Sequence, residues 1–275
     1  MPYAAVNHDE EPGESVEVFD LTDVGTLEHH LTVRSPLFGN LALNDVVEGS
    51  SNEFYVTEWQ SFPIPVGGKA GTANASLSVK LQRAAIVPLN VLKIPLTRVF
   101  RCTMDGTPEC TVASTYRFTM ANGITISKDR QTVFVNDPVI SSVIVFERLP
   151  DGSLEKVSQF KTKHMLDNIE MSFDGSLHGG SIPLPYTSGV TCEDAKELSA
   201  TKIVDGREVG CGKSPGGLLK ISLLGTGGKS FVDGTQVEMA VHDGSLLSGV
   251  SAALQFNKKV VMGGPYKPGL LLCDL

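Results

Sequence analysis

Three polar dipeptides stand at the start of short runs of alternating apolar residues. They are Asn44-Asp45, Asn122-Gly123 and Asp167-Asn168. The runs that follow, such as Ile124-Thr125-Ile126, have the two-residue period of a half-buried β-strand. One such dipeptide alone is most simply a turn. Recurrence at three strand starts instead predicts a repeated β architecture, such as a β-propeller, in which equivalent strand ends converge.

The side chains of these dipeptides are oxygen donors. Asn provides neutral carbonyl oxygens and Asp provides anionic ones, which are the ligands that calcium prefers, with about 6 to 8 around the ion. Transition metals prefer His or Cys. The pattern therefore predicts a calcium site.

The remaining sequence is typical of one all-β domain. A chain of 275 residues can bury a substantial core without being divided. Strand-like stretches such as 16–19 and 142–146 alternate with turn clusters, and the best helix candidate, residues 193–199, is short. We expect a single partial β-propeller over residues 1–275, with a probable insertion loop over residues 186–215.

Blade-like units can be marked from the same pattern. One is expected over residues 43–118 and a second over residues 122–160, with a hairpin turn at Pro150-Asp151-Gly152. A third opens at Asp167, and residues 237–275 supply further short strands. Roughly four blades are therefore expected in this chain.

Charge and motif content exclude several classes of function. The formal net charge of -8 disfavours a nucleic-acid surface, which needs clustered Lys and Arg. No apolar run is long enough to cross a membrane. Residues 225–230 superficially look like a phosphate loop, but Leu223 replaces the first glycine, so no nucleotide or other organic cofactor is expected.

Several segments resemble the paraoxonase and arylesterase family, whose members are six-bladed, calcium-dependent hydrolases of lactones and esters. The resemblance covers nearly the whole chain. Residues 43–47, 121–127 and 166–169 follow the order and approximate spacing of the family's metal motifs. Val6-Asn7-His8 is similar to the segment that carries a functional histidine, and residues 270–275 are similar to the terminal strand. A six-bladed type of propeller is implied.

The resemblance also implies roles for individual residues. It implies a catalytic calcium ion held by Asn44, Asn122, Asp167 and Asn168. Asp45 would bind a second, structural calcium ion. The catalytic ion would polarise the carbonyl of a small ester or lactone substrate, and His8 would help to activate water. Without the resemblance, His8 is a polar turn residue.

Two other functions stay open. A non-catalytic propeller could retain the calcium residues for stability or for binding, because propellers host many functions. A sugar-lactone hydrolase similar to gluconolactonases would also gather Asn and Asp around one metal. The sequence leaves the oligomeric state and any lipid association undefined.

The family pattern is incomplete here. Its glutamate ligand, an acidic ligand of the structural ion and the first histidine of a pair all lie upstream of the position that matches Met1. The resemblance therefore implies an N-terminally truncated member with weak calcium binding. Residues 179–183 replace a Cys-His pair of the family, and His178 is out of register with it, so no catalytic role is expected for His178.

The five cysteines bear on the redox state of the compartment in which the protein folds. Cys102 with Cys110, and Cys192 with Cys211, each bracket a short loop-like stretch, so two local disulfides are predicted. Disulfides would indicate an oxidising compartment, whereas free thiols in a cytosolic protein are the alternative. By resemblance, the partner of Cys273 lies upstream of this chain.

A glycosylation acceptor at Asn74-Ala75-Ser76 is compatible with secretion. Residues 1–12 contain no signal-peptide apolar core. We expect a secreted or secretory-pathway protein whose signal peptide is not present in this chain.

Overall fold

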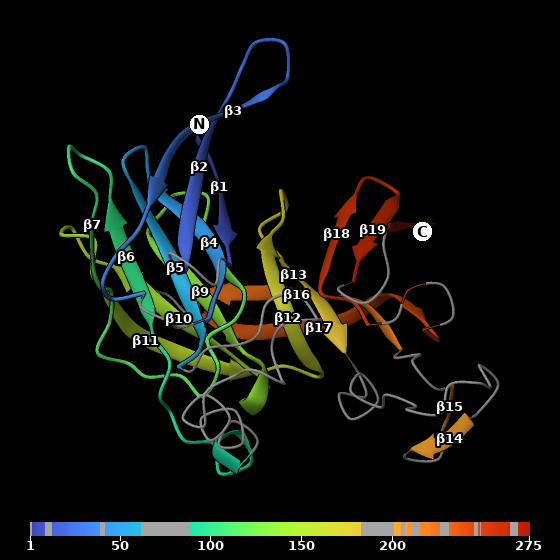
Figure 1. The fold of residues 1–275 in the computed structure, drawn as a ribbon. Coiled ribbons are helices and arrows are strands. Elements are labelled where there is room, and N and C mark those ends of the chain that lie inside the picture. Colours follow the sequence, from blue (N-terminus) through green and yellow to red (C-terminus); the bar gives the residue numbers. More distant parts are fainter. Residues whose placement is uncertain are drawn as a thin grey trace, which may run out of the picture. The chain divides into compact units, whose positions relative to one another are not determined.

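The fold is formed mainly by β-strands (Figure 1). The chain divides into two compact units, residues 1–140 with 144–158 and residues 141–143 with 159–275. The computed structural model describes residues 2–8, 13–38, 42–61, 88–182, 201–204, 207–210, 215–225, 231–244, 247, 249–264 and 269–275.

The strands form consecutive antiparallel sheets. The first is β1 (Pro2–Asn7), β2 (Ser15–Leu21) and β3 (Leu27–Val33). The second is β4 (Ala42–Ser50), β5 (Glu53–Gln60), β6 (Val99–Thr103) and β7 (Glu109–Val112). The third is β8 (Ile124–Ile126), β9 (Thr132–Asp137), β10 (Ser142–Arg148) and β11 (Leu154–Lys161), with the 3-10 helix η1 (Pro138–Ile140). The fourth is β12 (Met165–Met171), β13 (Leu177–Ile182), β16 (Gly216–Gly225) and β17 (Phe231–His242). The fifth is β18 (Ala252–Phe256), β19 (Lys259–Gly263) and β20 (Leu270–Asp274).

These up-and-down sheets have the strand order of propeller blades, and the all-β prediction is confirmed. Among the described residues there are five such sheets, so the prediction of a six-bladed type with roughly four blades present is wrong. Residues 2–33 form a complete sheet that the sequence pattern did not reveal, because most of β3 is exposed and shows no apolar alternation. The last sheet begins at Ala252 rather than at Val237, because β17 continues to His242.

The predicted insertion falls between two neighbouring strands of the fourth sheet. Leu177 of β13 pairs with Ile221 of β16 in an antiparallel ladder. The connection contains the hairpin β14 (Thr201–Val204) and β15 (Arg207–Gly210). Most other residues of the predicted 186–215 insertion lie outside the described residues, so its extent stays a prediction.

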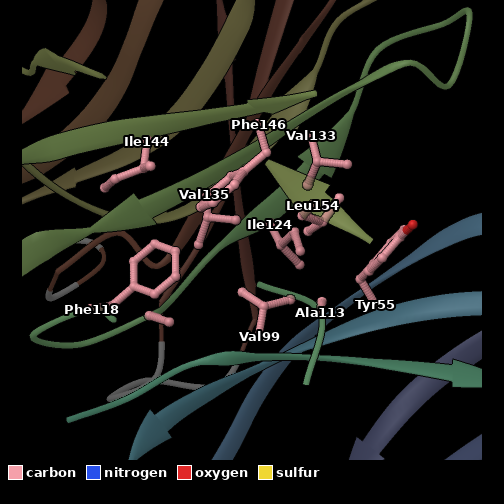
Figure 2. Packing of buried hydrophobic residues seen from close by; sticks show 11 residues of the cluster. Tyr55, Val99, Ala113, Phe118, Ile124, Val133, Val135, Ile144, Phe146 and Leu154 are labelled. Carbon is pink, nitrogen blue, oxygen red and sulfur yellow. The ribbon is translucent and has the colours of Figure 1, made fainter. Parts of the chain in front are cut away.

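Apolar residues of neighbouring sheets pack together in the first unit. Figure 2 shows Val99 and Ala113 on one side of a buried cluster, with Ile124 and Val135 facing them. A second cluster joins the first two sheets through the side chains of Val16, Val18, Val33, Phe54, Val56 and Phe100. Full burial of an apolar side chain of this size contributes about 1.5 to 3 kcal/mol, so these clusters hold the sheets of this unit together.

A buried ionic network lies beside the first of these clusters. The Glu53 carboxylate accepts hydrogen bonds from Arg101 and, at 2.8 Å, from Arg148. The Tyr55 hydroxyl lies 3.0 Å from Glu53 Oε1 and 2.7 Å from the Gly152 carbonyl oxygen. Gly152 has a φ of +81°, and a Cβ atom there would lie 2.3 Å from Arg101 Nε. The predicted Pro-Asp-Gly turn is therefore confirmed, and both its conformation and its close packing require glycine.

Of the two predicted disulfides, the one between Cys102 and Cys110 is confirmed. These residues face each other on β6 and β7. Cys192, Cys211 and the Asn74 acceptor site lie outside the described residues, and Cys273 of β20 is a free thiol. In the described part of the chain, no helix has the length and apolarity needed to cross a membrane.

Candidate functional site

Asn44 and Asp45 form a β-bulge in β4. The ladder register shifts here, so that these two residues oppose the single residue Thr57 of β5. The Asp45 N–H donates to Thr57 Oγ1 at 3.0 Å, and the same hydroxyl donates to the Asp45 carbonyl oxygen at 3.3 Å. A bulge bends the strand and redirects its side chains. The dipeptide therefore lies inside the strand, not before it as the alternation suggested.

Asp167 and Asn168 form the equivalent bulge in β12, in the second unit. They oppose the single residue Gly180 of β13. The Asn168 N–H donates to the Ser251 carbonyl oxygen at 2.8 Å. A Cβ atom at Gly180 would lie 2.5 Å from that same Ser251 oxygen, so the bulge packs against backbone that leaves room only for glycine.

Asn122 and Gly123 repeat the two-against-one pattern just before β8. The Asn122 N–H donates to the Asn136 carbonyl oxygen, and the Asn136 N–H donates to the Gly123 carbonyl oxygen, both at 2.9 Å. One residue of β9 therefore bonds two consecutive residues of the facing segment. The Asn122 side chain is buried as a result, with its residue 4% exposed.

The amide groups at the three sites share one property. The Oδ1 atoms of Asn44, Asn122 and Asn168 are buried and have no hydrogen-bond partner among the described residues. A buried acceptor without a partner costs about 1 to 3 kcal/mol. Amide oxygens are calcium ligands, so the chemistry of each of these side chains suits the predicted ion. Asn44 and Asn122 belong to the first unit and Asn168 to the second.

The Asp45 carboxylate is different because both of its oxygens are occupied. Oδ1 accepts the Val46 N–H at 2.9 Å, and Oδ2 accepts the Ile124 N–H at 2.9 Å. The second bond connects the bulge of β4 to the first residue of β8. No oxygen of Asp45 is left without a partner, so the structural calcium at this residue stays a prediction from the family resemblance.

His8 follows β1 and lies against a carboxylate. Its Nδ1 atom is 2.8 Å from Glu14 Oε2. The same Oε2 atom accepts the Leu43 N–H at 3.0 Å. The hydrogen bond to Glu14 raises the pKa of His8 above its ordinary value of 6.5, against the opposite effect of burial. The histidine is therefore connected, through one carboxylate, to the residue that precedes Asn44.

Two acidic residues near the bulge of β4 were not predicted. Glu14 is one, and no pattern in the sequence singles it out as a partner of His8. Glu58, 1% exposed, pairs with Leu43 and forms an ion pair with Arg98 at 3.4 Å. Burial raises the pKa of Glu58. Glu58 could have been found from the sequence, because an acidic residue is unusual in an apolar strand such as β5, which is buried on both faces.

His178 lies in the interior of the second unit, 1% exposed. Its Nδ1 atom accepts the Gln255 N–H at 3.2 Å, and its Nε2 atom lies 3.2 Å from Ser176 Oγ. These contacts are those of a buried structural histidine. No group of three or more His, Cys, Asp or Glu side chains that could hold a metal occurs among the residues that the structure describes.

Comparison with solved structures gives distant similarities. A protein from Lactobacillus plantarum is 10% identical with a TM-score of 0.48, and the match covers 99% of this chain and 63% of that protein. A gluconolactonase from Xanthomonas campestris is 12% identical with a TM-score of 0.46, covering 98% of this chain and 71% of that one. A periplasmic gluconolactonase from Pseudomonas aeruginosa is 14% identical with a TM-score of 0.39, covering 95% and 76%. The chain thus spans less than two thirds of the Lactobacillus plantarum protein, and scores this low support no functional argument.

Comparison at the level of sequence is more informative. No curated protein matches the chain. The family model described as Arylesterase matches residues 91–209, a range that contains Asn122, Asp167 and Asn168. Over this range the chain is therefore similar in sequence to the arylesterases.

Proposed function

We propose that this protein is a calcium-dependent hydrolase of small esters or lactones. The observation that carries the proposal is the recurrence of a buried amide oxygen without a hydrogen-bond partner at Asn44, Asn122 and Asn168. The arylesterase match supports it independently, because it includes two of these three positions.

The proposed ligands of the catalytic calcium are Asn44, Asn122, Asp167 and Asn168. Asp167 supplies the one formal negative charge of this set, which suits a hard divalent cation. When bound, calcium supplies Lewis acidity that polarises a substrate carbonyl and favours negative charge on its oxygen.

His8 is the proposed general base. Donation from its Nδ1 atom to Glu14 leaves Nε2 as a proton acceptor. A neutral imidazole positioned in this way can take a proton from water as the water attacks an ester or lactone carbonyl. The Cys102–Cys110 disulfide supports an oxidising, secretory location for this chemistry.

Hydrolysis of an aryl ester at increasing calcium concentrations tests the proposal. We expect turnover to require calcium and to be lost in Asp167→Ala. Calcium binding by the same variant, measured by calorimetry, should weaken in parallel. Asp274→Ala is the matched control, because Asp274 is an exposed acid of the same unit that contacts Lys259. Full activity in excess chelator, or in Asp167→Ala, would contradict the proposal.

A lactone panel separates the two enzymatic alternatives. Preference for aromatic or aliphatic substrates is expected of an arylesterase-like enzyme, whereas preference for sugar lactones would favour a gluconolactonase-like one. Calcium binding without turnover of any ester or lactone would instead favour a non-catalytic binding protein.

A further inference from the structure

Glu14 contacts both His8 and the strand that carries Asn44. Its Oε2 atom lies 2.8 Å from His8 Nδ1 and accepts the Leu43 N–H at 3.0 Å. The Glu14 side chain is 8% exposed and the His8 side chain is 38% exposed. The carboxylate is therefore held in the protein, whereas part of the imidazole reaches solvent.

Gly13, the residue before Glu14, is held by contacts that do not involve His8. Gly13 has a φ of +103°, which is accessible to glycine at little cost. Arg34 Nη1 donates to the Gly13 carbonyl oxygen at 3.0 Å. Leu43, the backbone donor to Glu14, is fully buried. These contacts fix the carboxylate without any contribution from His8.

We propose that Glu14 is a positioning residue: it orients His8 through Nδ1 and connects the histidine to Leu43, the residue that precedes the β4 bulge. The inference deepens the proposed function and rests on it for the role of His8. A carboxylate that accepts from Nδ1–H selects the tautomer with a proton acceptor at Nε2. Glu14 itself transfers no proton.

The charged and polar groups around this pair come from three strands, β1, β2 and β4. Glu14 precedes β2, and on β2 the nearest further acid is Glu17. Asn7 Nδ2 of β1 donates to Glu17 Oε1 at 3.3 Å, so Glu17 is engaged next to His8. The Leu43 N–H is the contact from β4. Among the residues that the structure describes, Glu14 is thus the acid in direct contact with the imidazole.

The test is to titrate His8 by NMR in the full chain and in Glu14→Gln. Gln retains a side-chain oxygen that can accept the Leu43 N–H but has no charge. We expect the pKa of His8 to fall toward its ordinary value of 6.5. The kcat/KM for an ester should fall about tenfold or more, with its acidic limb moved to lower pH. Asp20→Asn is the control, because Asp20 forms a similar pair with His30 at 2.8 Å on the same sheet.

Each outcome of this experiment decides the proposal. A lower pKa of His8 in Glu14→Gln, with the value in Asp20→Asn unchanged, supports it. An unchanged pKa of His8 in a folded Glu14→Gln overturns it, and so does a loss of activity whose pH profile keeps its shape. If the full chain is inactive, the proposed hydrolase function fails, yet the titration of His8 still decides whether Glu14 orients it.

Discussion

The carboxylate of Asp45 accepts a 2.9 Å hydrogen bond from the backbone N–H of Ile124. Asp45 lies in the bulge of β4, and Ile124 is the first residue of β8. A side chain of one sheet thereby satisfies the first backbone donor of the next sheet. This bond places the Asn44-Asp45 and Asn122-Gly123 segments next to each other within the first unit.

Replacement of Asp45 by Ala should destabilise the protein by about 2 to 3 kcal/mol, because the change leaves the N–H of buried Ile124 without its charged acceptor. Chemical denaturation measures the loss. Asp45→Asn keeps one acceptor oxygen and should lose less. Equal stability of Asp45→Ala and the wild type would show that the bond to Ile124 contributes nothing.

Calcium should stabilise the wild type against heat, since a ligand that binds the folded state raises its stability by about 2.7 kcal/mol at a hundredfold excess over Kd. In Asn122→Ala this gain should be smaller. In the presence of chelator, Asn122→Ala should unfold at a temperature close to that of the wild type, because the substitution removes an oxygen that has no hydrogen-bond partner in the described part of the protein. Thermal unfolding with and without calcium measures both effects. Asn52→Ala, at an exposed turn residue, should respond to calcium as the wild type does.

His178 should make the protein sensitive to acid. Burial lowers the pKa of His178 below 6.5, Lys220 lowers it further, and Asp174 opposes them. Below pH 6.5 the unfolded chain therefore binds a proton that the folded protein excludes. The contribution of neutral His178 to stability is complete above pH 6.5. This contribution is lost as the pH falls toward the pKa of His178 in the folded protein, by up to about 1.4 kcal/mol per pH unit.

The comparison of wild type with His178→Asn isolates this contribution. Glu170 of β12, which pairs with His178, is unchanged in both proteins, as are Lys220 and Asp174. We expect the difference in unfolding free energy between the two proteins to shrink as the pH falls from 7.5 to 5. A difference in unfolding free energy that stays constant over this pH range would show that protonation of His178 does not destabilise the fold.

Removal of the Cys102–Cys110 disulfide should cost about 2 to 3 kcal/mol in the chain-entropy description, because it closes a loop with a sequence separation of 8. Urea unfolding of the double Cys→Ala variant, compared with oxidised wild type, gives this value. Reductant should lower the unfolding free energy of the wild type toward that of the variant, and should leave the unfolding free energy of the variant unchanged. A wild type that does not respond to reductant would contradict a stabilising role.

Local pattern determined much of this protein. Alternating apolar residues predicted an all-β chain, the residue types of Pro150-Asp151-Gly152 predicted a turn, and the short spacing of Cys102 and Cys110 predicted their disulfide. The polar dipeptides were identified from sequence because each stands at the start of an apolar alternation. These features depend on neighbours along the chain, which the sequence contains directly.

Tertiary structure decided the rest. The bulges at Asn44-Asp45 and Asp167-Asn168 depend on the register of the facing strand, which shifts by one residue only when both strands are in place. The contact of Glu14 with His8 and Leu43 depends on a strand that lies 29 residues further along the chain. The exposed strand β3 carries too little apolar alternation to be recognised without its partner β2. The sequence thus determined where the candidate oxygen donors lie along the chain, and long-range strand pairing determined the backbone conformation at those residues.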